Sequence, residues 1–72
     1  MIEIKPDEMI QVQDYLRRTL NGQIGVRPRA QTPDSVEVIL NGEFIGVVYK
    51  NVEDGETSYD FTMSILDIDL TA

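Results

Sequence analysis

The sequence predicts an α+β fold, with an N-terminal helix packed on one face of a four-stranded antiparallel β-meander. The first observation is the apolar periodicity of a helix near the N-terminus. The second is the alternation of apolar and polar residues in four later segments. The third is Asn41-Gly42 between two of these segments, because this dipeptide favours the type I′ turn of a β-hairpin. With 72 residues, the chain is expected to form a single small domain.

The predicted helix covers about residues 6–20. Pro6 is tolerated in the first turn, and the two acidic residues after it are favoured by the positive end of the helix dipole. One face of this helix is apolar, with Met9, Val12, Leu16 and Leu20 on it. Arg17 and Arg18 lie in the last turn, and Asn21-Gly22 is expected to end the helix in the left-handed conformation.

Four strands are expected at about residues 23–29, 35–40, 43–50 and 57–66, with a tail at residues 67–72. An uninterrupted pairing across Asn41-Gly42 places Val36 opposite Val47, and Val38 opposite Ile45, on the face that the helix covers. Pairing of Tyr49 with Tyr59 would then bring Val47 to Phe61 on the same face. The acidic segment 51–56 is interpreted as a solvated loop with Gly55 as its turn residue, because it lacks the ligand spacing of a calcium-binding loop.

Several apolar residues remain for the face that one helix cannot cover. Ile39 and Phe44 are expected to form a cross-strand pair there. At Ile65-Leu66 the alternation changes phase, so a continuous flat strand would place carboxylates in the core. A bulge is therefore expected there, or a departure from the sheet. The predicted interface residues are Ile39, Phe44, Val48, Leu66, Ile68 and Leu70. Either the tail covers this patch within one chain or another subunit does.

Composition excludes several kinds of site. The chain has no cysteine, which rules out disulfides and thiolate zinc sites, and no histidine, which removes the commonest metal ligand and general base. We therefore predict no catalytic residues, no cofactor and no metal site. A chain this short usually needs a disulfide, a structural metal or a partner subunit to stabilise its small core. With the first two excluded, we expect self-association. The lack of cysteine also fits a cytoplasmic location.

Charge and hydropathy narrow the range of partners. The net charge of −7 argues against nucleic acid, because such binding depends on neutralising phosphates. No run of about 18 apolar residues is present, so we expect no membrane span. The N-terminus has no basic start followed by an apolar stretch, so we expect no signal peptide.

The basic residues are unevenly placed. Arg17, Arg18, Arg27 and Arg29 lie between Tyr15 and Pro33, a stretch without a carboxylate. One interpretation is a helix end that favours cations, followed by solvated strand arginines. The alternative is a basic patch that binds an anion or an acidic peptide, because the arginine fork suits carboxylates and phosphates.

Several short motifs occur in a recognisable order. They are Lys-Pro-Asp-Glu, Tyr-Leu-Arg-Arg, Val-Arg-Pro-Arg, Gly-Glu-Phe-Ile-Gly-Val, Asp-Gly-Glu and Ile-Leu-Asp-Ile-Asp-Leu. In this order, from about Lys5 to Leu70, the chain resembles a family of short uncharacterised bacterial proteins, domain of unknown function 3126. The resemblance implies a bacterial, cytosolic, stand-alone protein with no assigned activity, and it brings no catalytic residues.

The sequence therefore favours a non-catalytic protein–protein interaction module, homodimeric through the uncovered sheet face and the C-terminal segment. The partner is expected to be a second copy or another protein. The arginine cluster supplies the alternative, an anion-binding or acidic-peptide-binding regulatory module. An enzyme would need a paired acid and base, whereas Asp60, Asp67 and Asp69 alternate with apolar residues as strand surface does.

Overall fold

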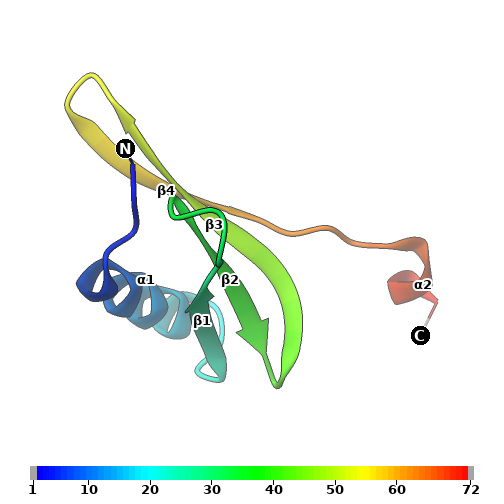
Figure 1. Ribbon diagram of the computed structural model, residues 1–72. Coiled ribbons are helices and arrows are strands. Elements are labelled where there is room, and N and C mark those ends of the chain that lie inside the picture. Colours follow the sequence, from blue (N-terminus) through cyan, green and yellow to red (C-terminus); the bar gives the residue numbers. More distant parts are fainter. Residues whose placement is uncertain (1, 72) are drawn as a thin grey trace.

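The computed structural model describes residues 2–71, and it confirms the α+β fold (Figure 1). Helix α1 precedes one antiparallel sheet whose strand order is β1-β2-β3-β4, so each strand pairs with the next along the chain. The elements are α1 (Pro6–Thr19), β1 (Ile24–Pro28), β2 (Ser35–Leu40), β3 (Glu43–Glu53), β4 (Glu56–Thr62) and α2 (Asp67–Leu70). Met1 and Ala72, the last residue of the predicted tail, lie outside the described residues.

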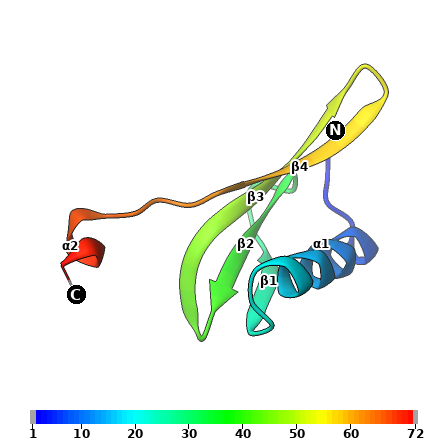
Figure 2. The same cartoon turned by 180° about the vertical axis from the view of Figure 1, so that it is seen from behind.

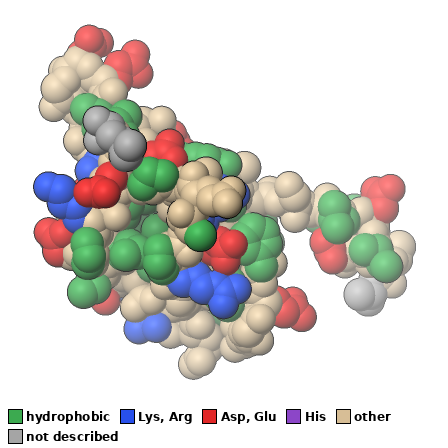
Figure 3. Space-filling model, in the orientation of Figure 1, with side chains coloured by type: hydrophobic (Ala, Val, Ile, Leu, Met, Phe, Trp, Pro, Cys, Tyr) green, Lys and Arg blue, Asp and Glu red, His purple; other side chains and the backbone are tan. Residues whose placement is uncertain are grey.

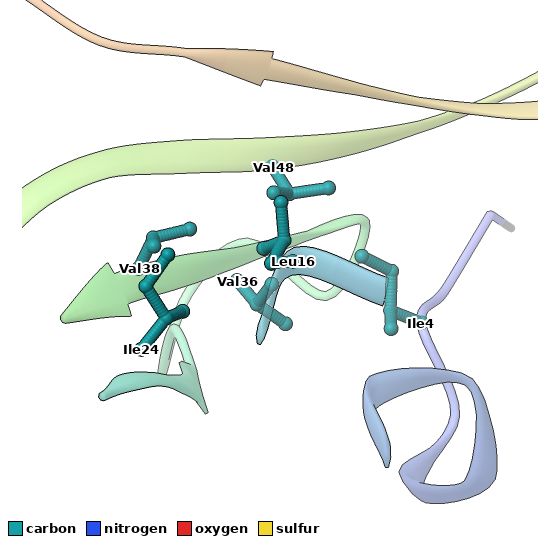
Figure 4. Packing of buried hydrophobic residues seen from close by; sticks show 6 residues of the cluster. All are labelled: Ile4, Leu16, Ile24, Val36, Val38 and Val48. Carbon is teal, nitrogen blue, oxygen red and sulfur yellow. The ribbon is translucent and has the colours of Figure 1, made fainter. Parts of the chain in front are cut away.

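The core lies between α1 and one face of the sheet. Leu16 is the buried residue of α1, and it packs against β-branched side chains of the first three strands (Figure 4). The buried cluster consists of Ile4, Leu16, Ile24, Val36, Val38 and Val48. Helix α1 packs mainly on β1, so it lies toward one side of the sheet and leaves the inner side of β4 uncovered (Figure 2).

Side chains of α1 complete the outer edge of β1. The Val26 N–H donates to Gln13 Oε1 at 3.0 Å, and Arg17 Nε donates to the Ile24 carbonyl oxygen at 2.5 Å. The Val26 N–H points away from β2, and Pro28, two residues further along the strand, would direct its N–H to the same side. Because proline has no N–H, no unpaired donor is left there. The edge therefore exposes few unpaired backbone groups, which protects it against pairing with another chain.

The register of β2 and β3 differs from the predicted one because β3 contains a bulge. Asn41 and Gly42 have φ values of 52° and 83°, as a type I′ turn requires, and Ile39 pairs with Phe44 as predicted. Val38 then pairs with Gly46, so Ile45 is an extra residue.

The bulge moves the rest of β3 to the opposite face. Val36 pairs with Val48 and not with Val47, and Val48 is 2% exposed in the core. The prediction that Val48 belongs to the uncovered face is therefore wrong. Sequence alternation alone does not locate an inserted residue, because each side of the bulge alternates correctly.

The second hairpin is longer and tighter than predicted. Strand β3 continues to Glu53 and β4 begins at Glu56, so the expected loop at 51–56 is reduced to the turn Asp54-Gly55, with φ values of 51° and 80°. Phe61 pairs with Val48 and Tyr59 with Lys50, because the bulge shifts β3 by one residue. Phe61 nevertheless packs on the helix side, as expected.

The helix ends one residue before its predicted end and without a left-handed residue. The C-cap is Leu20, which has helical φ and ψ, and the φ of Gly22 is not positive. The Gln23 N–H donates to Asn21 Oδ1 at 2.8 Å, and the Ile24 N–H donates to the Asn21 carbonyl oxygen at 3.1 Å. The Asn21 side chain thus makes the turn into β1 that a left-handed glycine was expected to make.

The C-terminal arm, defined as residues 63–71, leaves the sheet at the end of β4 (Figures 1 and 2). Strand β4 ends at Thr62, four residues before its predicted end, and α2 forms a single turn within the predicted tail. The change of phase at Ile65-Leu66 is thus resolved by departure from the sheet. Within residues 2–71, neither helix is long and apolar enough to cross a bilayer.

Candidate interaction surfaces

The three most exposed large apolar side chains among residues 2–71 lie on the C-terminal arm. Ile65, Leu66, Ile68 and Leu70 are 59–73% exposed. The arm orders itself locally, because the Leu66 N–H donates to Asp69 Oδ2 at 3.0 Å and the Asp69 N–H donates to the Leu66 carbonyl oxygen at 2.9 Å. The space-filling view shows its end as a separate knob of apolar and acidic side chains (Figure 3). Three of the predicted interface residues thus lie on the arm.

A groove of about 560 Å³ separates the arm from β3. Its walls include Phe44, Val47 and Tyr49 of β3, and Met63 and Leu66 of the arm. Phe44 stays 56% exposed, so the arm does not cover it within one chain. The structure brings two predicted interface residues, Phe44 and Leu66, to opposite sides of one groove. We call this groove the β3–arm groove.

Ile39 pairs with Phe44 on the face opposite α1 and is half-buried. Next to it, Arg27 Nε donates to Glu37 Oε1 at 2.9 Å in an exposed ion pair. This side of β1 and β2 is therefore polar. The apolar part of the open face lies toward β3 and the arm.

A second groove, of about 400 Å³, lies between α1 and β4 on the other face of the sheet. Val12 and Tyr15 line it from the helix, and Tyr59 and Phe61 line it from β4. Val48 lies in its floor. We call it the α1–β4 groove. Sequence reasoning missed it because a helix was assumed to cover one whole face. The sequence feature that indicates this groove is the pair of aromatic residues Tyr59 and Phe61. Their side chains have more apolar surface than the narrow apolar face of α1 can cover.

The Glu8 carboxylate is the centre of a polar cluster at one end of this groove. Lys50 Nζ lies 2.9 Å from Oε1 and 2.7 Å from Oε2 of Glu8. The Lys5 N–H donates to Oε1 at 3.0 Å, and the Tyr59 hydroxyl donates to Oε2. Lys50 Nζ also donates to the Glu3 carbonyl oxygen at 3.0 Å. The side chains of Lys50 and Glu8 are only 14% and 16% exposed.

These contacts shift the ionisation of both acids. Hydrogen bonds from Lys50, Tyr59 and the Lys5 backbone lower the pKa of Glu8 to about 2. The hydrogen bond to Glu8, with some loss of hydration, raises the pKa of Tyr59 to about 12. Each carboxylate oxygen has at least one donor. The hydrogen-bonding groups of the cluster thus bind one another. The cluster therefore serves a structural purpose, because it links α1, β3 and β4.

The four arginines of the alternative hypothesis are held by different partners. Arg17 donates to the Ile24 carbonyl oxygen, Arg27 pairs with Glu37, and Arg29 Nη1 donates to Ser35 Oγ at 3.2 Å. The Arg18 guanidinium lies over the Tyr15 ring, 5.6 Å from its centroid. In the described part of the chain, Arg18 takes part in no ion pair. The same holds for Arg17 and Arg29, whose acceptors are neutral oxygens, so Arg27 alone of the four has its charge paired in the described structure.

The described residues do not gather the ligands of a metal ion. No group of three or more carboxylates among residues 2–71 is placed to hold one. Asp60, one of the acids considered for catalysis, is hydrogen-bonded to Asn51 on the β3–β4 hairpin. Asp67 and Asp69 lie on the arm, beyond the end of the sheet.

Comparison with known proteins gives a family without an activity. A family model described as "Protein of unknown function (DUF3126)" matches residues 8–69, which is most of the chain. No curated protein and no solved structure matched the sequence. The matched region begins inside α1 and ends at Asp69, so it includes most of the arm.

Proposed function

We propose that this chain, which belongs to the DUF3126 family, is a non-catalytic protein–protein interaction module that pairs with a second copy of itself through the open sheet face and the C-terminal arm. The observation that carries the proposal is the arm: its four large apolar side chains are mostly exposed, and one of them, Leu66, lines the same groove as Phe44, which is 56% exposed. A group of exposed apolar side chains of this kind is typical of an interface.

The energetics favour burial of this surface. Fully burying one large apolar side chain is worth about 1.5–3 kcal/mol, so four or five of them supply a driving force as large as the stability of many small domains. A core of six residues, such as the buried cluster of this chain, leaves little stability in reserve. Association of two copies would add stability to a chain that has no cysteine for a disulfide and no cysteine or histidine for a zinc site.

The arrangement of the patch favours a second copy over a different partner. The β3–arm groove has one wall from the sheet and one from the arm, and both walls present apolar side chains, with Glu43 and Asp69 among them. Two such patches related by a two-fold axis would place the arm of each copy against the open face of the other. The proposal includes the cytoplasmic location expected from the sequence. The anion-binding alternative gains no support, because Arg17, Arg27 and Arg29 are each held by a different partner of their own chain and the described contacts do not bring the four guanidinium groups around one site.

Substitutions at the two walls of the groove test the proposal. Phe44→Asp and Leu66→Asp each place a carboxylate in the expected interface, so each should raise the dimer dissociation constant by at least about tenfold. Analytical ultracentrifugation over a range of protein concentrations measures this constant directly.

Ser58→Asp is the matched control, because Ser58 is exposed on the β3–β4 hairpin and the change in charge is the same. The control should dissociate like the unmodified chain. If Phe44→Asp and Leu66→Asp dissociate no more readily than Ser58→Asp, the open face and the arm are not the interface.

A further inference from the structure

The outer edge of β4 is the open edge of the sheet. Strand β4 pairs with β3 alone among the described residues, whereas side chains of α1 close the outer edge of β1. Strand β4 has no proline, lysine, arginine or bulge, which are features that keep another strand from pairing with a free edge. The edge is therefore suited to accept an added strand.

The backbone groups that face this edge follow from the register of β3. The Lys50 N–H donates to the Asp34 carbonyl oxygen at 2.8 Å, on the β2 side of β3. Lys50 pairs with Tyr59, so the backbone groups of Tyr59 point away from β3. Because the direction of these groups alternates along a strand, those of Thr57 and Phe61 point the same way. In the described structure, these three residues make no backbone hydrogen bond outside the sheet ladder.

The two faces of β4 differ in chemistry. Tyr59 and Phe61 lie on the α1 side of the sheet, where both line the α1–β4 groove. Glu56 and Asp60 lie on the opposite side, because successive side chains of a strand alternate. These two carboxylates are separated by about 13 Å along the strand. An added strand would therefore meet aromatic side chains on one face and carboxylates on the other.

The carboxylates near this edge have no cationic partner among residues 2–71. Four acidic residues lie along β4 and its turn from β3, and none takes part in an ion pair there: Glu53, Asp54, Glu56 and Asp60. Acidic side chains gather at the tip of this hairpin (Figure 3). Asp7 of α1 is also near, because its charge adds to the rise in the Tyr59 pKa that the hydrogen bond to Glu8 mainly causes.

The lysines of this region do not offset the negative charge. Lys50 binds Glu8, and Lys5 lines a hollow beside Val52 of β3 to which β4 contributes no residue. A second copy of β4 would bring further carboxylates and no cation to the edge. A strand with basic side chains is therefore the better match, because opposite charges on neighbouring strands attract.

We infer that the β4 edge binds an extended basic segment of a partner protein as a fifth strand of the sheet. The segment lies antiparallel to β4, and its backbone pairs with the outward-facing groups of Thr57, Tyr59 and Phe61. Its apolar side chains pack on the α1 side, and lysine or arginine side chains on the other face lie opposite Glu56 and Asp60. This contact goes beyond the self-association proposed above, because it uses neither Phe44 nor the arm.

A short synthetic peptide of alternating valine and lysine, as long as β4, is the probe. At saturation it should slow the hydrogen–deuterium exchange of the Thr57, Tyr59 and Phe61 amides at least about tenfold, as measured by NMR. The Ser58 and Asp60 amides should change little, because they already face β3. A peptide with the same residues in two blocks has the same charge without the alternation, and it should protect none of the three amides.

Substitutions separate the backbone contact from the charge. Thr57→Pro removes one outward N–H without breaking the ladder to β3, so it should weaken peptide binding at least about fivefold, whereas Thr57→Val should not. Asp60→Asn should weaken binding about threefold. Asp14→Asn makes the same change on the exposed side of α1 and should leave the affinity unchanged.

Two results would overturn the inference. One is a peptide that fails to bind, or that binds without protecting the three amides, since charge alone would then hold it. The other is protection of the same amides in the unmodified chain without peptide, because a second copy would then occupy the edge and self-association would stand. Protection by the peptide in a chain that is monomeric at all concentrations would support the inference and reject only the self-association.

Discussion

At the scale of single residues, Glu8 connects more of the molecule than any other polar side chain described. Its carboxylate binds the backbone of Lys5 before α1, Lys50 on β3 and Tyr59 on β4. From the sequence, only its place in the first turn of the helix could be predicted. The partners on β3 and β4 are more than 40 positions away, and their register depends on the bulge.

The lowered pKa of Glu8 makes stability depend on acid pH. Its pKa is about 2 in the folded chain, below the ordinary value of 4.5, so its contribution is complete above pH 4.5 and is lost as the pH falls toward 2. Glu8→Gln should therefore lower the free energy of unfolding at pH 7 by about 1–3 kcal/mol and flatten this acid dependence. Urea unfolding at a series of pH values measures both effects.

Glu3→Gln is the control for this prediction, because the contact of Glu3 in the cluster is made by its backbone oxygen. It should keep the acid dependence of the unmodified chain. Identical pH profiles for Glu8→Gln and the unmodified chain would show that the cluster does not form in solution.

Gly46 is needed because β4 approaches it closely. A Cβ atom at this position would lie 2.5 Å from the Thr62 carbonyl oxygen and 2.6 Å from Cε1 of the Phe61 ring. Since the carbonyl belongs to the paired backbone of β4, Gly46→Ala should destabilise the fold by about 1–3 kcal/mol. Thermal unfolding would measure this against Gly22→Ala, where an added Cβ meets nothing within 4 Å. Equal unfolding temperatures would argue against the bulge at Ile45.

At the scale of the elements, the sequence predicts each strand and the helix, but not how they are offset. Periodicity places α1 and β2 within a residue of their observed bounds. It cannot place the bulge, because the apolar residues Val47 and Val48 fit either face. The bulge also explains why the candidate site was predicted only in part. Phe44 and Leu66 share a groove, whereas Val48, which follows the bulge, lies in the core.

The edge of β1 gives an element-scale prediction. Gln13 of α1 accepts the Val26 N–H, which would otherwise face solvent. Gln13→Leu keeps the size of the side chain and removes the acceptor, so the Val26 amide should exchange with deuterium about fivefold faster or more, as expected for loss of about 1 kcal/mol.

Amide exchange followed by NMR measures this at a single residue. Gln11→Leu, on the exposed side of α1, should leave the exchange of Val26 unchanged. Unchanged exchange in Gln13→Leu as well would show that α1 does not close the β1 edge.

At the scale of the whole molecule, a small body carries an arm that contributes nothing to the core. The buried cluster ends at Val48, and the chain extends 43 Å along one axis and 23 Å along the other two. The sequence indicated either a bulge or a departure from the sheet at Ile65-Leu66, and the structure has the departure. The sequence could not predict the direction in which the arm projects, because the direction of a segment that does not pack on the core is not determined by its local sequence pattern.

Removal of the arm separates folding from association. A chain that ends at Thr62 keeps every buried residue, so its free energy of unfolding as a monomer should lie within about 1 kcal/mol of that of the full-length monomer. Denaturant unfolding of both chains, at concentrations low enough to dissociate any dimer, gives this comparison. A shortened chain that fails to fold would mean that the arm belongs to the core of its own chain.

The solution mass of the unmodified chain, measured by sedimentation equilibrium from low to high micromolar concentration, tests the central claim most directly. The account predicts a mass that rises to twice the chain mass of 8.2 kDa. A mass that stays at 8.2 kDa over the whole range would contradict it.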